Sequence, residues 1–172
     1  NEEDFKKIKL KQRVGINIKN RDLTASILDK KYDLPLGLAP AGMGGMMYPN
    51  GEILVANAAA DMNIPYILST MSICSLEQVA KNSASSFWFQ LYVMKDKEFV
   101  KNIIARAKKA RCKVLVITMD LPLLAQRHKD LKNGLSAPPK LGLKQILQLI
   151  IKPEWCFKML FCKNKTFYKN PV

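Results

Sequence analysis

Several polar residues that could bind a ligand stand at or just beyond the ends of short apolar segments. Gln90 and Tyr92 end one such segment, Thr118 ends a second, and Arg127 follows in the stretch beyond it. In parallel α/β folds the carboxyl ends of the strands face an open crevice, where ligands bind. We therefore expect these four side chains to share one pocket.

Each of these residues also has a structural explanation. Gln90 and Tyr92 alternate along a strand and so point to the same face, where an aromatic side chain beside an amide commonly packs in a core. Thr118 is a common strand residue, and Arg127 could be a surface charge. His128, the only histidine, lies between two basic residues and is expected to be exposed. The combination of residues carries the functional hypothesis.

The elements that would position these residues form four βα units. The expected strands are 34–39, 65–69, 87–93 and 114–119, and the expected helices are 52–62, a helix that begins after Ser75, and one from Asp96 to about Ala110. Ser75 and Gln78 fit a capping box, and Asp96 is a predicted N-cap. Continuously apolar strands are typical of a parallel sheet that is covered by helices. The pattern suits a barrel wall; a doubly wound sheet also satisfies it, although no Gly-x-Gly-x-x-Gly follows the first strand.

Composition limits the class of protein and its partners. The chain has 172 residues, 48% of them hydrophobic, which is enough for one domain with a substantial core. Its four cysteines have no paired metal-ligand spacing, so we expect reduced thiols in a cytosolic protein and no metal. The net charge of +14 could attract nucleic acid or an anionic membrane. Specific nucleic-acid binding is disfavoured because the charge is spread over helices without a stacking platform.

The carboxyl-terminal part differs from the rest in composition. Residues 140–172 contain seven lysines and a single acid, Glu154, interleaved with Trp155 and three phenylalanines. Such a composition is typical of a segment that lies at a membrane surface. The apolar stretch 141–151 is too short to span a bilayer, which needs about 20 apolar residues.

Taken together, the motifs resemble the FMN-dependent 2-hydroxy acid dehydrogenase and oxidase family. The resemblance rests on Leu38-Ala39-Pro40, Leu68-Ser69-Thr70, Phe89-Gln90-Leu91-Tyr92-Val93, Ile117-Thr118-Met119-Asp120 and Arg127-His128-Lys129-Asp130. Within the family, 88–92 and 133–136 are most similar to the membrane-associated, cytochrome- or quinone-linked bacterial L-lactate dehydrogenases. The resemblance covers nearly the whole chain. It implies an α/β fold, namely a partial (β/α)8 TIM barrel with the first four βα units and a long loop after the fourth strand.

The resemblance also implies FMN as the cofactor and assigns roles to single residues. The positions that match flavin-binding residues are Pro40, Ala41, Gly42, Ser69, Gln90 and Thr118. Tyr92 matches a catalytic tyrosine that faces the substrate, and Arg127 matches an arginine that binds the substrate carboxylate. The chemistry agrees, because an amide can donate and accept along a flavin edge and a guanidinium binds a carboxylate through two parallel bonds. His128 matches no catalytic position.

The implied organisation has three parts: a lead-in at 1–34, βα units one to four at 35–133, and a long loop at 134–172 with a membrane-surface segment. The implied reaction is oxidation of L-lactate, a 2-hydroxy acid, to pyruvate, with a quinone or cytochrome as electron acceptor. The implied setting is the cytoplasmic face of the bacterial cell membrane, with the intact enzyme a homo-oligomer.

Some family features have no counterpart in the sequence. The family's catalytic histidine base and its glycine-rich phosphate site belong to later barrel units. We therefore expect an N-terminal fragment, truncated to the first half of the barrel and inactive alone. The alternative is a non-catalytic basic module that binds membrane surfaces, or the remnant of a decayed gene.

Overall fold

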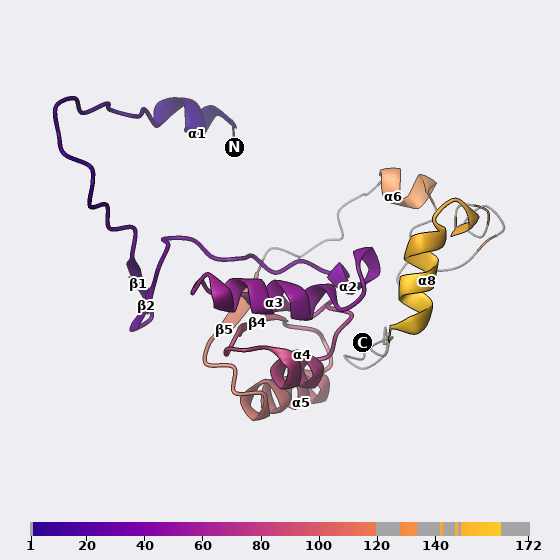
Figure 1. Ribbon diagram of the computed structural model, residues 1–172. Coiled ribbons are helices and arrows are strands. Elements are labelled where there is room, and N and C mark those ends of the chain that lie inside the picture. Colours follow the sequence, from indigo (N-terminus) through magenta and orange to yellow (C-terminus); the bar gives the residue numbers. More distant parts are fainter. Residues whose placement is uncertain (1, 120–127, 134–141, 143–146, 148, 163–172) are drawn as a thin grey trace.

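A parallel sheet lies at the centre of the protein (Figure 1). The computed structural model describes residues 2–119, 128–133, 142, 147 and 149–162. The sheet has the order β3 (Ile67–Ser69), β4 (Trp88–Tyr92) and β5 (Leu115–Thr118). One helix precedes each strand along the chain: α3 (Gly51–Asp61), α4 (Leu76–Asn82) and α5 (Lys97–Lys109). Strands alternate with helices along the chain, so the predicted α/β class is confirmed.

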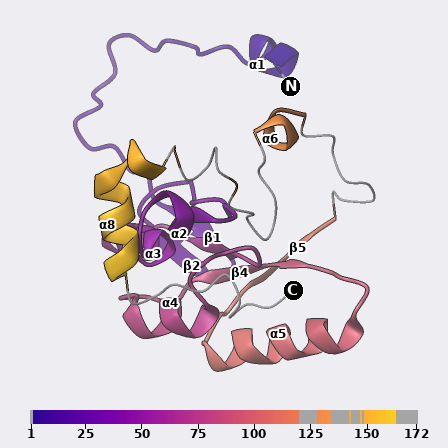
Figure 2. The same cartoon turned by 90° about the vertical axis from the view of Figure 1, so that its right-hand side faces the viewer.

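The ladder register divides the side chains between the two faces of the sheet. Ser69 pairs with Gln90 and Tyr92 pairs with Thr118, so these polar side chains share one face. The opposite face carries Leu68, Phe89 and Leu91, which pack with Ile53, Ala56 and Ala59 of α3, Leu76 and Val79 of α4, and Ile103 and Ala107 of α5. Figure 2 shows α4 and α5 beneath the sheet. The helices therefore cover this face at β3 and β4, whereas Leu115 and Ile117 on the same face of β5 are 39% and 54% exposed.

The first expected strand is reduced to a single parallel bridge beside β3. The Leu38 N–H donates to the Pro65 carbonyl at 2.8 Å, and the Ile67 N–H donates to the Leu38 carbonyl at 3.0 Å. Pro35 and Pro40 flank the bridge and have no N–H to extend the ladder. The prediction of a full strand is wrong here, although the segment does lie next to β3.

The lead-in contains elements that the sequence did not predict. They are α1 (Glu2–Lys7) and an antiparallel hairpin of β1 (Ala25–Ile27) and β2 (Lys30–Tyr32). The two hairpin loop residues, Leu28 and Asp29, both have positive φ, which is typical of a type I′ turn. Residues 8–18 form no strand. Figures 1 and 2 both place α1 away from the sheet.

The starts of α4 and α5 are as predicted. The Gln78 N–H donates to Ser75 Oγ at 3.2 Å and the Ser75 N–H donates to Gln78 Oε1 at 2.8 Å, which completes the capping box of α4. Asp96 accepts hydrogen bonds from the Glu98 and Phe99 N–H groups and caps α5. These caps satisfy backbone donors that a helix leaves unpaired.

Three further helices are α2 (Gly44–Met47), α6 (His128–Lys132) and α8 (Pro153–Phe161). The Trp155 indole N–H on α8 donates to the Met46 carbonyl of α2 at 2.9 Å, so α8 lies against α2. Over the described ranges, no helix combines the length and the apolar character that crossing a membrane requires.

A bidentate ion pair joins α4 to α5. The Arg106 Nε and Nη2 atoms donate to the two Glu77 carboxylate oxygens at 2.7 and 2.9 Å. These hydrogen bonds lower the pKa of Glu77 from 4.5 to about 2. Because the Glu77 side chain is 54% exposed, solvent screens the pair, and we expect a contribution of about 0.5–1 kcal/mol.

This pair predicts a pH-dependent difference between the protein and Glu77→Gln. A lowered folded-state pKa stabilises the fold fully above pH 4.5, and the contribution is lost as the pH falls toward 2. Urea unfolding should show the wild type more stable than Glu77→Gln at pH 6, with the difference shrinking at pH 3. Glu98→Gln removes an exposed acid paired to Lys101 at 3.5 Å and is the matched control. A constant difference between the two pH values would contradict the assignment.

Candidate functional site

Three side chains form a chain of hydrogen bonds across the carboxyl ends of β3, β4 and β5. Ser69 Oγ donates to Gln90 Oε1 at 3.3 Å, and Gln90 Nε2 donates to Thr118 Oγ1 at 2.7 Å. Gln90 is 1% exposed and Ser69 is 4% exposed. We call this chain of contacts the Ser69–Gln90–Thr118 relay. The predicted proximity of these three residues is thus found in the structure.

Thr70 is a site residue whose contribution the sequence analysis missed. Its hydroxyl donates to the Gln90 carbonyl at 2.6 Å and accepts from the Tyr92 N–H at 3.2 Å, and its own N–H donates to Gln90 Oε1 at 3.3 Å. These bonds continue the pairing of β3 with β4 beyond the last residue of β3. The signal in the sequence was the second hydroxyl residue directly after Ser69.

The loop after the first strand segment is tied to the relay. Residues 40–42 are exposed, and the following Met43 N–H donates to the Met71 carbonyl at 2.9 Å. The Met71 N–H in turn donates to Ser69 Oγ at 3.1 Å. Gly42 permits this approach, because a Cβ there would lie 3.3 Å from Met71 Cβ. The predicted flavin-facing loop therefore lies beside the end of β3.

The remaining predicted residues have different outcomes. Tyr92 is half-buried on the same face of β4 as Gln90, as expected from strand alternation. Arg127 lies outside the described residues, so its place in the pocket stays a prediction. His128 begins α6 and is exposed, as predicted. No cluster of metal-binding side chains occurs among the residues that the structure describes.

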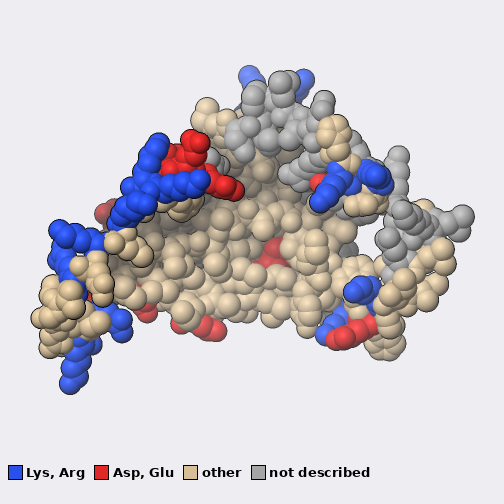
Figure 3. All heavy atoms as spheres, turned by 90° about the horizontal axis from the view of Figure 1, so that it is seen from above, with Lys and Arg blue, Asp and Glu red and all other residues tan. Residues whose placement is uncertain are grey.

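Basic residues do not form a continuous track over the face shown in Figure 3. Lys and Arg side chains gather toward its two ends, and its central part is mostly uncharged. A long polyanion such as nucleic acid binds through a continuous row of phosphate contacts. On this face, the described residues offer no such row.

The inner side of α8 lines a groove against the segment between α2 and α3. Its lining residues are Tyr48, Pro49, Asn50, Leu54, Lys158, Phe161 and Cys162. The Cys162 thiol donates to Asn50 Oδ1 at 3.5 Å, and Lys158 Nζ lies 5.2 Å from the centre of the Tyr48 ring. These contacts fix α8 on the body of the protein.

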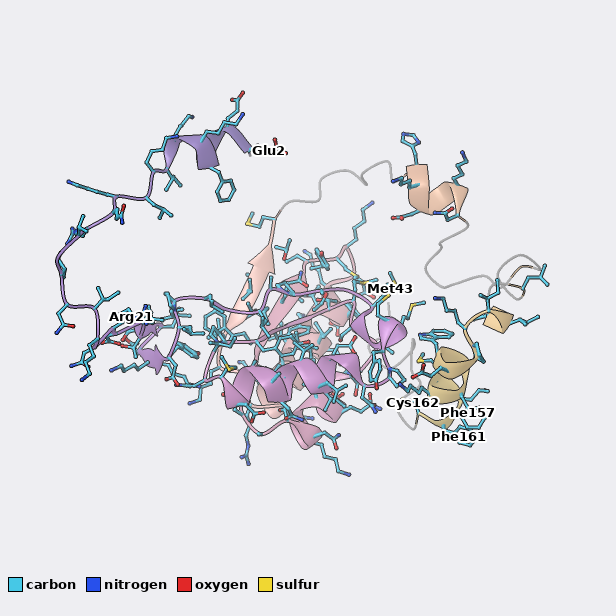
Figure 4. All side chains as sticks on the ribbon, turned by 45° about the horizontal axis from the view of Figure 1, so that its top comes forward. Glu2, Arg21, Met43, Phe157, Phe161 and Cys162 are labelled. Carbon is cyan, nitrogen blue, oxygen red and sulfur yellow. The ribbon has the colours of Figure 1, made fainter. Side chains whose placement is uncertain are left out.

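Helix α8 also exposes apolar side chains. The Phe157 and Phe161 ring centres are 4.7 Å apart, and these residues are 65% and 72% exposed (Figure 4). Leu160 on the same helix is also exposed, as are Ile150 and Ile151 just before it. The segment thus presents an apolar surface to its surroundings.

Parallel βα units with polar side chains and a loop at the carboxyl ends of the strands are typical of α/β proteins that bind a ligand there. The sequence pattern of the FMN-dependent dehydrogenase family matches residues 1–170. The chain therefore belongs to this family. The predicted family is confirmed. Dehydrogenases of this family depend on FMN.

Relatives and solved structures agree with this assignment. The chain is 42% identical over 154 residues to the L-lactate dehydrogenase of Ectopseudomonas mendocina (strain ymp), with 90% of this chain and 40% of the relative covered. It is 39% identical over 162 residues to the L-lactate dehydrogenase of Serratia proteamaculans (strain 568), with 94% of this chain and 42% of the relative covered.

Among solved structures, the monotopic membrane protein (S)-mandelate dehydrogenase has a TM-score of 0.87 at 28% identity, over 99% of this chain and 45% of that one. A mandelate oxidase with (S)-mandelic acid has a TM-score of 0.67 at 31% identity, over 72% of this chain and 37% of that one. The chain therefore spans less than half the length of these relatives.

The contacts of Thr70 predict that Thr70→Val destabilises the fold by about 1–3 kcal/mol. The substitution keeps the shape but leaves the Tyr92 N–H and the Gln90 carbonyl without their hydroxyl partner. Urea unfolding measures the loss. Thr24→Val, at an exposed position of the lead-in, should change the free energy of unfolding by less than about 0.5 kcal/mol. Equal effects of the two variants would contradict the role of Thr70.

Proposed function

We propose that this chain forms the flavin-facing part of an FMN-dependent enzyme that oxidises L-lactate to pyruvate. The Ser69–Gln90–Thr118 relay carries the proposal, because it places donors and acceptors together at the carboxyl ends of three parallel strands. The L-lactate dehydrogenase relatives support the substrate class. Residues 35–133 would be the first four βα units of a (β/α)8 barrel, with 1–34 leading in and 134–172 following as a long loop.

The described residues fit the polar edge of a flavin. Gln90 has two amide N–H donors and one acceptor oxygen, and one of the N–H groups donates to Thr118 Oγ1. Ser69 and Thr118 carry hydroxyls that both donate and accept. Residues 40–42 are exposed beside this edge and would lie against the ring. Bound FMN would supply the acceptor for the two electrons removed from the substrate.

Substrate binding falls to residues on the same rim. Tyr92 lies two residues after Gln90, on the same face of β4. From this position its hydroxyl would hydrogen-bond the substrate oxygen. Arg127 would bind the carboxylate through two parallel bonds and thereby fix the α-carbon. We extend the proposal to a quinone or cytochrome as electron acceptor at the cytoplasmic face of the membrane, and to a homo-oligomeric intact enzyme.

A chimaera tests the function directly. This chain is joined in frame to the part of the E. mendocina L-lactate dehydrogenase that lies beyond the matched region. We expect a yellow protein with a flavin absorption spectrum that reduces a dye only when L-lactate is present. Gln90→Leu should lower FMN affinity at least tenfold, because it removes the central donor of the relay.

Thr118→Val keeps the side-chain volume and separates loss of the relay from loss of the fold. It should weaken FMN binding less than Gln90→Leu, since Gln90 remains in place. A chimaera that folds, by circular dichroism, but holds no flavin would contradict the proposed function.

A second candidate function is binding to an anionic membrane surface through residues 140–172. It is favoured by the exposed Phe157, Leu160 and Phe161 together with Lys152 and Lys158 on or beside the same helix. Apolar side chains in the interface and lysines at the headgroups stabilise such binding. The structural relative described as a monotopic membrane protein supports it. This function is compatible with the catalytic one.

Vesicle sedimentation tests the membrane proposal. With vesicles that contain anionic lipid, the double variant Phe157→Ser/Phe161→Ser should bind at least tenfold more weakly, because it removes apolar surface from the interface. Phe5→Ser, at a residue that is 78% exposed on α1, is the matched control and should bind as the wild type does. Unchanged binding of the double variant would refute this assignment.

A further inference from the structure

Glu52 links the two loops that border the proposed flavin site. It lies in the first turn of α3 and is only 2% exposed. Its Oε1 atom accepts from the Gly45 N–H and from the Ile73 N–H, each at 2.9 Å. Gly45 follows the exposed residues 40–42, and Ile73 follows the end of β3. One carboxylate oxygen therefore holds both loops at a fixed separation.

The burial of this carboxylate is costly, which argues for a specific role. Its Oε2 atom is the one buried side-chain nitrogen or oxygen in the described part of the chain that has no hydrogen-bond partner. An apolar side chain would avoid this desolvation. The N-terminal end of α3 offsets part of the cost, because helix dipoles favour negative charge there. Burial, and then the nearby Glu52 charge, raise the pKa of the Cys74 thiol to about 12.

The loop that Glu52 holds has a strained backbone. Met43 and Asn50, on either side of α2, both adopt the left-handed region with φ 58°. Asparagine adopts this region readily, whereas a methionine persists there only where the surrounding contacts determine the conformation. Gly45 fits closely between its partners, since a Cβ would lie 2.8 Å from Glu52 Oε2 and 2.8 Å from Ile73 Cβ. Glu52 supplies contacts that keep the loop in this conformation.

We propose that Glu52 is a positioning residue that holds the loop at residues 40–43 in the conformation that binds the flavin ring. The link passes from Glu52 to Gly45, through α2 to Met43, and from Met43 to the Met71 carbonyl beside Ser69. This inference rests on the proposed function of the site. Glu52 itself would touch neither the cofactor nor the substrate.

Substitutions at Glu52 should weaken FMN binding by the chimaera described above, which carries all 172 residues of this chain. FMN is titrated into the protein, and quenching of the flavin fluorescence gives the dissociation constant. We expect Glu52→Ala to raise the constant at least tenfold. Glu52→Gln keeps an oxygen that can accept both N–H groups and should raise it only about threefold. Gly45→Ala should resemble Glu52→Ala, because the added Cβ would displace the loop.

A matched control separates positioning from general destabilisation. Val79→Ala removes buried volume from α4, which supplies neither of the N–H groups that Glu52 binds, and should leave the dissociation constant within twofold of the wild type. Amide hydrogen exchange, followed by NMR on the protein without FMN, reports the loop itself. The Gly45 and Ile73 amides should lose protection in Glu52→Ala and keep it in Val79→Ala.

The outcomes distinguish this proposal from the function on which it rests. If the wild type binds FMN and Glu52→Ala binds it equally well, the positioning role is overturned and the proposed function stands. If the wild-type chimaera does not bind FMN, the proposed function fails, and the positioning role toward the flavin fails with it. Unchanged exchange at Gly45 and Ile73 in Glu52→Ala would refute the link between the loops even where FMN binds.

Discussion

The parallel register of β3, β4 and β5 is the constraint on which the site depends. Ser69 pairs with Gln90, and Thr118 lies on the same face of the next strand. The strand register alone therefore brings these three polar side chains together. A shift of one residue would turn Gln90 toward the helices and Phe89 toward the site. The core of Leu68, Phe89 and the three helices opposes such a shift, so packing on one face fixes the chemistry on the other.

Two buried polar groups complete this arrangement from the loops. Thr70 continues the pairing of β3 with β4, and Glu52 joins the loops that follow the first two strand segments. Both lie where hydrogen bonds are poorly screened, so loss of either leaves unpaired groups in the interior. The site is therefore held by a framework that reaches beyond the residues expected to touch a ligand.

The sequence predicted the parts of the structure that depend on local pattern. The caps at Ser75 and Asp96, the later strands and the shared face of Gln90 and Tyr92 follow from spacing and propensity. The single bridge at Leu38 was not predicted. An apolar run predicts a strand, but it does not show how many backbone hydrogen bonds remain when prolines without an N–H lie nearby. The roles of Thr70 and Glu52 depend on contacts between segments distant in sequence, such as that of Glu52 with Ile73, which spacing alone cannot show.

The most direct test is an NMR titration of the 15N-labelled protein with FMN, following the Gln90 side-chain amide and the backbone amides of 40–43 and 69–71. Binding at the strand ends predicts that these signals shift together and saturate at one FMN per chain. Shifts confined to α8, or none at all, would contradict the assignment of the relay as the flavin site.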